Sequence, residues 1–195
     1  SADGGAIYAS GSIFLCNGTT PSAGNSARLG GAFYSESTVF LNVHDVGANT
    51  ANQGGCVYAE TSVTFNSADA VGCVAQGDGG AALSDRVILQ GNGVSLFKDN
   101  RAGGAGGVAR AVVVVVKGAG LVSSPGQSGG ALSAIDAIHI SNASMLSNTA
   151  RTDGGAASVS NLIVITDAMF ANNVVTAAGG TGGAVSLSGS AFITG

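Results

Sequence analysis

Apolar and polar positions alternate in short runs that return at a regular interval along the chain. Each run has two apolar residues separated by one position, as in Ile13/Leu15 and Val39/Leu41. An alternation of period two is typical of a β-strand with one face turned to a core. The same pattern recurs at Val63/Phe65, Val87/Leu89, Val114/Val116, Ile138/Ile140, Ile163/Ile165 and Ala191/Ile193.

A pair of glycines precedes each of these strands and marks the repeat. The pairs begin at Gly4, Gly30, Gly54, Gly79, Gly106, Gly129, Gly154 and Gly182, at intervals of 23 to 28 residues. A short first strand follows each pair, and a third short strand ends the repeat, most clearly at 97–100 and 170–173. A period of this length indicates a solenoid, whose units bury their apolar faces by stacking on one another. We predict an all-β parallel β-helix of about eight rungs, with three short strands per rung.

Asparagines stand at a similar place near the end of several repeats, a few residues before the next glycine pair. Stacked at one corner of the solenoid, their side chains can bond to one another and to the backbone of adjacent turns. We interpret this ladder as structural, because buried polar side chains need partners. Its members are Asn25, Asn49, Asn100, Asn148 and Asn173.

A repeated Gly-Gly-Ala-apolar word followed by Phe-x-x-Asn resembles the repeats of the chlamydial polymorphic outer membrane proteins, within the pectin-lyase-like superfamily. The first word stands at 4–7, 30–33, 129–132 and 182–185, and strict Phe-x-x-Asn at Phe97 and Phe170. The resemblance covers essentially the whole chain. It implies a right-handed β-helix on a cell surface, serving as a stalk or adhesin.

Composition narrows the class of protein and of partner. With 33 glycines in 195 residues, 45% apolar and 9% charged, the chain suits one elongated β domain over 1–195. The net charge is −4 and the seven Lys and Arg are scattered, which argues against nucleic acid or anionic lipid as partners. The longest apolar run, Val112–Val116, is too short for a spanning helix, so we expect no membrane insertion by this segment. We interpret the chain as a mature or partial one.

Three acidic residues, Glu36, Glu60 and Asp85, occupy the same position in three consecutive repeats. In a solenoid they would stand about 4.8 Å apart. Like charges so close either turn into solvent or accept a hard cation such as Ca²⁺. The sequence leaves three alternatives open: an exposed acidic turn, a calcium site, or the catalytic acids of a pectate-lyase-like enzyme.

The three tyrosines, Tyr8, Tyr34 and Tyr58, also share one position in consecutive repeats, so we predict that they stack. Turned outward, such a row could dock sugar rings or another chain. The alternative is a self-stacking ladder partly covered by a turn.

The run Val112, Val113, Val114, Val115 and Val116 must send two or three side chains outward if it is a strand. We therefore predict an apolar association patch there. Either a neighbouring chain covers this patch, or a flanking loop such as 118–127 folds over it.

The cysteines and the N-glycosylation sequons are evidence about the cellular compartment of the protein. Cys16, Cys56 and Cys73 cannot all pair, and a disulfide between Cys56 and Cys73 is possible but undecided. Asn17 and Asn142 begin N-glycosylation sequons. Each lies 13 residues after the first glycine of its repeat, which places both in the same turn of the solenoid.

The leading hypothesis is an extracellular, non-enzymatic structural protein, a β-helical stalk or fibre subunit that joins copies of itself head to tail. Adhesion to glycans or to a partner on a host or cell surface, and glycosylation, are parts of this hypothesis. We expect no cofactor, with Ca²⁺ as the one candidate. The alternatives are a polysaccharide-acting enzyme and a carbohydrate-binding module.

Overall fold

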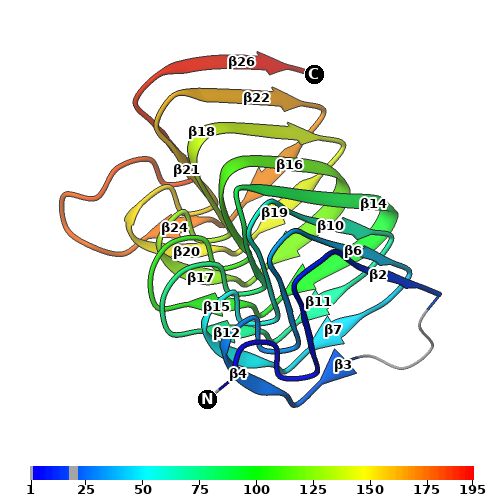
Figure 1. Ribbon diagram of the computed structural model, residues 1–195. Helices are drawn as coiled ribbons and strands as arrows, with labels where there is room; N and C mark the ends of the chain where they lie inside the picture. The colour runs from blue at the N-terminus through cyan, green and yellow to red at the C-terminus, as the bar shows by residue number, and fades with distance from the viewer. Residues whose placement is uncertain (1, 18–21) are drawn as a thin grey trace.

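The computed structural model describes residues 2–17 and 22–195, and it confirms the all-β class (Figure 1). Parallel strands stack as a β-solenoid of about seven turns, with a partial rung at the end. The strands of one rung pair with their equivalents in the next, so each strand position forms a ladder along the rod. Among the described residues there is no helix long and apolar enough to cross a membrane.

The first two ladders follow each glycine pair. The first ladder is β1 (Ile7–Ala9), β5 (Phe33–Ser35), β9 (Val57–Ala59), β13 (Ala82–Leu83), the starts of β16 (Ala109–Val122) and β18 (Leu132–Ser141), β21 (Ala157–Val159) and β25 (Val185–Leu187). The second ladder is β2 (Ile13–Cys16), β6 (Thr38–Asn42), β10 (Ser62–Asn66), the start of β14 (Arg86–Lys98), the middle of β16, the end of β18, β22 (Leu162–Thr166) and β26 (Ser190–Thr194).

The third ladder ends each predicted rung, and a fourth ladder follows it that the sequence analysis did not predict. The third is β3 (Ser22–Ala23), β7 (Val46–Gly47), β11 (Ala70–Val71), the ends of β14 and β16, β19 (Ser144–Leu146) and β23 (Met169–Ala171). The fourth is β4 (Ser26–Leu29), β8 (Thr50–Gln53), β12 (Val74–Ala75) and β15 (Arg101–Ala102), then β17 (Pro125–Ser128), β20 (Thr149–Asp153) and β24 (Val174–Val175).

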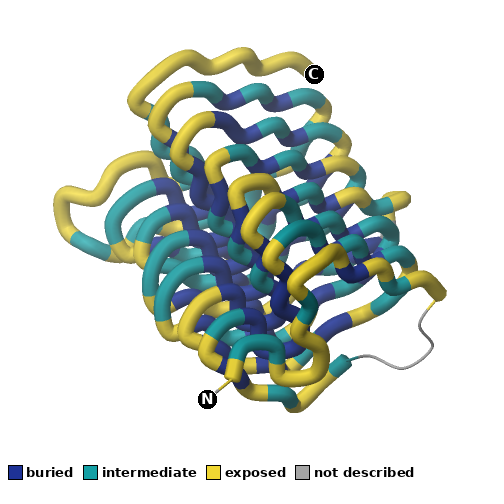
Figure 2. The backbone as a smooth tube through the Cα atoms, viewed as in Figure 1, coloured by how far each residue is buried: buried dark blue, intermediate teal, exposed yellow. Residues whose placement is uncertain are grey.

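The core lies between these ladders and follows the predicted alternation. In the second ladder Val63 pairs with Val39 and Val87, and Phe65 pairs with Leu41 and Leu89, and all of these side chains are fully buried. Figure 2 shows the buried stripe running through the stacked rungs, with exposed backbone at the corners and over the last rung.

The glycine pair is explained by two separate constraints at the corner of each rung. The first glycine of every pair has a left-handed backbone, with φ between 57° and 67°. In the first seven pairs the second glycine has no room for a side chain: a Cβ on Gly80 would lie 1.9 Å from the carbonyl oxygen of Gly107 in the next rung. The corner therefore needs glycine twice, once for conformation and once for close stacking.

Candidate functional site

The structure brings the three tyrosines together on the outer side of the first ladder. Ring centroids of Tyr8 and Tyr34 are 5.2 Å apart with planes at 10°, and those of Tyr34 and Tyr58 are 5.5 Å apart at 13°. Tyr34 is only 8% exposed, because its two neighbours cover both faces of its ring. The stack therefore presents ring edges along its length, and a sugar ring cannot lie flat on Tyr34.

The acidic residues lie beside this stack and accept hydrogen bonds from it. The hydroxyl of Tyr8 donates to Oε1 of Glu36 at 2.5 Å, and that of Tyr34 donates to Oε1 of Glu60 at 3.3 Å. Each tyrosine thus bonds to the acid of the following rung. Sequence reasoning treated the two ladders separately and missed this pairing. The signal was the shared spacing, because Glu36 and Glu60 each stand two residues after a tyrosine, directly past the end of the first strand of their rung.

The pairing stops at the third tyrosine. Asp85 takes the place of glutamate in the next rung, and its side chain is one methylene shorter. Within the described residues no hydrogen bond joins the Tyr58 hydroxyl to Asp85. Burial raises the pKa of Tyr58, and the nearby charges of Glu60 and Asp85 raise it further.

A cleft of about 280 Å³ opens where this pairing stops. Three of its lining residues, Tyr58, Leu83 and Arg110, come from adjacent rungs of the first ladder. Three others are carboxylates, those of Glu60, Asp78 and Asp85. The lining also includes Gln53 before a glycine pair, and Ser84, Val112 and Ile135 after the first strands.

Tyr34, the middle tyrosine of the stack, has a strongly raised pKa, and burial is the main cause. Burial raises the pKa of Tyr34 to about 12, with further contributions from the charge of Glu60 and a hydrogen bond to it. The pKa of Tyr8 is also raised, first by its hydrogen bond to Glu36. The hydroxyls of Tyr8 and Tyr34 are therefore neutral donors across the physiological range.

The calcium hypothesis for Glu36, Glu60 and Asp85 gains no support from this geometry. Across the described residues no three His, Cys, Asp or Glu side chains lie close enough together to hold a metal ion. Two of the three carboxylates accept bonds from tyrosine hydroxyls instead. Ca²⁺ prefers six to eight converging oxygens, which this row does not supply.

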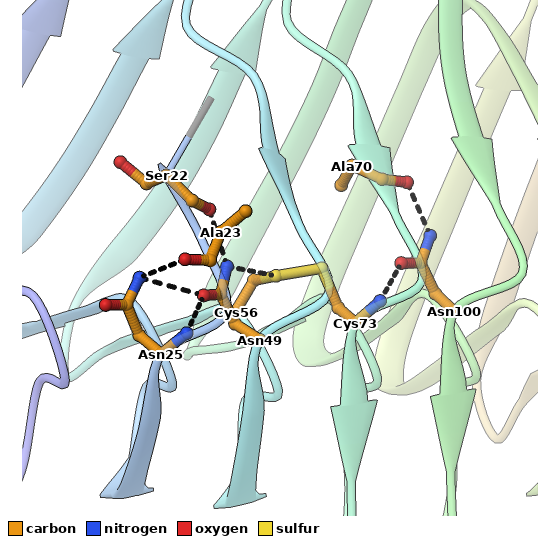
Figure 3. Close-up of a disulfide and its surroundings, with 8 residues drawn as sticks. All are labelled: Ser22, Ala23, Asn25, Asn49, Cys56, Ala70, Cys73 and Asn100. Atoms are coloured by element: carbon orange, nitrogen blue, oxygen red, sulfur yellow. Dashed lines mark hydrogen bonds between the residues drawn. A yellow bond between two sulfur atoms is a disulfide. The ribbon is translucent and has the colours of Figure 1, made fainter. Parts of the chain in front are cut away.

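The asparagines form a ladder with a repeating bond pattern (Figure 3). In Asn100, Oδ1 accepts from the backbone N–H of Cys73 at 2.9 Å, and Nδ2 donates to the carbonyl of Ala70 at 2.8 Å. Asn49 and Asn148 bond in the same way to the preceding rung, and all three side chains are fully buried. Asn173 repeats the pattern at the next rung, whereas Asn25 bonds to Asn49 and to its own turn. The ladder satisfies backbone groups between the third and fourth strands.

The disulfide left undecided by the sequence is present between Cys56 and Cys73 (Figure 3). Cys73 stands in the asparagine ladder, since its N–H bonds to Asn100 as other ladder members bond to theirs. The Sγ atom of Cys56 lies 3.2 Å from Nδ2 of Asn49, which donates to it. Both cysteines are fully buried. In this rung a disulfide therefore stands at the ladder position that an asparagine fills in the neighbouring rungs. Cys16 is free and exposed.

The two sequon asparagines lie in exposed turns. Asn17 and Asn142 both have a left-handed backbone, with φ of 56° and 47°, and both follow strands of the second ladder. Residues 18 and 19 of the first sequon lie outside the described residues. Asn142 is exposed, and it lines a surface pocket together with Ser144, the third residue of its sequon.

The valine run is more buried than its sequence suggests. Val114 and Val116 belong to the core, Val113 and Val115 are half-buried, and only Val112 is exposed, at 36%. The expectation that 118–127 is a loop folding over this run was wrong. These residues continue β16 and form most of β17, because the chain builds its third and fourth strands there.

Comparison of the chain with protein-family models, with curated proteins and with solved structures found no match. The functional argument therefore rests on the geometry alone.

Proposed function

We propose that this chain is a segment of an extracellular, right-handed β-helical rod, a stalk or fibre subunit that joins copies of itself head to tail. The observation that carries the proposal is the regular stacking of the core ladder. Val63 pairs in register with Val39 and Val87, and all three side chains are fully buried. The inward row through Ile140 and Ile165 continues to Ile193 in β26. Rungs that repeat the same inward residues and the same strand edges can be extended by further rungs of the same kind.

The strands of neighbouring rungs pair in parallel, as β5 does with β9 and β22 does with β26. Copies that continued this pairing would therefore stack in one orientation along the axis. Such a contact is heterologous and so produces filaments.

The buried disulfide supports an extracellular setting, because disulfides persist in oxidising compartments. The exposed turns at Asn17 and Asn142 support glycosylation there, since the acceptor asparagine must be accessible. Expression in a eukaryotic secretory cell should yield glycan-bearing chain, and Asn142→Gln should remove one glycan by mass. A single unmodified mass in that host would refute the glycosylation part of the proposal.

Sedimentation velocity over a range of concentrations tests the assembly. The wild-type chain should form larger species as concentration rises. Ile193→Arg should weaken stacking roughly thirtyfold, because burying one isoleucine side chain contributes about 2 kcal/mol. Val71→Arg is the matched control, because Val71 is 40% exposed on the side of the rod. Monomer at all concentrations, or unchanged assembly of Ile193→Arg, would contradict the proposal.

A polysaccharide enzyme is the second candidate, favoured by one observation: Glu60 and Asp85 both line the cleft. Incubation with acidic polysaccharide, followed by ultraviolet absorbance of unsaturated products, distinguishes it from the structural role. We expect no activity, because Glu36 and Glu60 are engaged by tyrosine hydroxyls. Activity that is lost in Glu60→Gln would favour the enzyme.

A further inference from the structure

The cleft beside Tyr58 holds more negative than positive charge. Three carboxylates line it, those of Glu60, Asp78 and Asp85, together with one cation, Arg110. Arg110 donates from Nη1 to the Ala111 carbonyl at 3.1 Å and forms no ion pair within the described residues. An excess of carboxylates on a partly enclosed surface attracts a further cation.

The same cleft also offers aliphatic surface. Val112 and Ile135 are 36% and 54% exposed, and both line the cleft together with Leu83. Farther along the first ladder the outward positions after Arg110 are serines, at Ser133, Ser158 and Ser186. The apolar contact is therefore local to the acidic part of the groove, which favours a ligand that carries a charge on an alkyl stem.

The size of the cleft suits a small group. Its volume of about 280 Å³ lies near the lower end of the range of about 300–1,000 Å³ for drug-sized ligands. One amino-acid side chain fits that volume.

We propose that this cleft binds a primary alkylammonium group, the side chain of a lysine presented by a partner polypeptide. The ammonium has three N–H donors and no acceptor, which suits separate carboxylates on Glu60 and Asp85 in adjacent rungs. Its four-carbon stem packs against Leu83, Val112 and Ile135. A planar guanidinium would need a carboxylate placed for a two-point contact, so the point charge of lysine is the better match.

Nuclear magnetic resonance titration of the full chain with Nα-acetyl-lysine methylamide tests this binding. We expect a dissociation constant on the order of 1 mM, the value for about fourteen non-hydrogen atoms at the efficiency typical of larger ligands. The shifts should involve Tyr58 and Leu83. The Nε-acetylated derivative, which lacks the charge, should not bind. Equal binding of 1,5-diaminopentane would show that a free amine suffices, whereas preference for the lysine derivative would show that the site reads a side chain on a polypeptide.

Asp85→Asn keeps the shape of the side chain and should weaken binding at least tenfold. Asp167→Asn is the matched control, because Asp167 is exposed and lies outside the cleft. Circular dichroism should show that both variants remain folded. Absence of shifts at 20 mM probe, or wild-type affinity in Asp85→Asn, would overturn the proposal. So would binding of CaCl₂ in place of the lysine derivative. The assembly of the rod would be untouched by any of these results.

Discussion

The asparagine ladder makes the sharpest prediction about stability, and Asn100→Ala tests it. The Asn100 side chain is fully buried and satisfies two backbone groups of the preceding rung, the N–H of Cys73 and the carbonyl of Ala70. Alanine can adopt the same backbone conformation, but its side chain cannot form a hydrogen bond with either group. The substitution leaves one donor and one acceptor buried without partners.

Each buried polar group left without a partner costs about 1–3 kcal/mol, so the two together should lower the free energy of unfolding by about 3 kcal/mol after local relaxation. For a chain of this size a loss of 1 kcal/mol lowers the melting temperature by about 2–4 °C. We therefore expect Asn100→Ala to melt about 6–12 °C below the wild type.

Thermal unfolding by circular dichroism measures this change, and hydrogen exchange locates it at the amide of Cys73. Asn52→Ala is the control, because Asn52 is exposed and no side-chain hydrogen bond of Asn52 is observed in the described residues. It should melt within about 1 °C of the wild type. If Asn100→Ala melted like this control, or if the Cys73 amide kept its protection, the ladder would have no stabilising role.

Three further predictions concern the disulfide, the tyrosine stack and the glycine corner. Replacing both cysteines of the disulfide by serine should cost about 3 kcal/mol by the chain-entropy estimate for a closed loop of this length, and unchanged denaturant midpoints would contradict it. Tyr34 should ionise last in an absorbance titration, at about pH 12 in the folded chain and near pH 10 in urea. Because folding raises this pKa, its contribution to stability is present below pH 10 and is lost as the pH rises from 10 to 12. Glu60→Gln should lower the Tyr34 midpoint, and ionisation of all tyrosines at pH 10 in the folded chain would refute the coupling. Gly80→Ala should lower the melting temperature sharply or prevent folding, whereas Gly11→Ala, whose Cβ meets nothing within 4 Å, should be neutral.

The sequence predicted the stacked rungs well because one physical requirement repeats in every rung. Inward residues such as Val63 and Phe65 must alternate, and each corner must contain glycine, so both leave a periodic signal. The fourth strand left none, because its inward residues are mostly alanines such as Ala51 and Ala75, which do not contrast with the small residues around them.

The candidate site was harder to predict, because it depends on relations between rungs. Tyr34 and Glu60 lie 26 residues apart in sequence, and their hydrogen bond exists only in the stacked register. The cleft brings Glu60 and Asp85 of adjacent rungs together with Arg110 and Ile135 from rungs farther along, and no sequence motif joins these positions. The disulfide likewise required the position of Cys73 in the asparagine ladder.

Stacking of rung on rung between copies would make this solenoid a structural unit of a longer fibre. Electron microscopy of the purified chain in negative stain distinguishes such fibres from single rods. We expect filaments with an axial repeat of about 35–40 Å, the length of the stacked rungs at about 4.8 Å each. Single rods of that length at every concentration would contradict head-to-tail assembly.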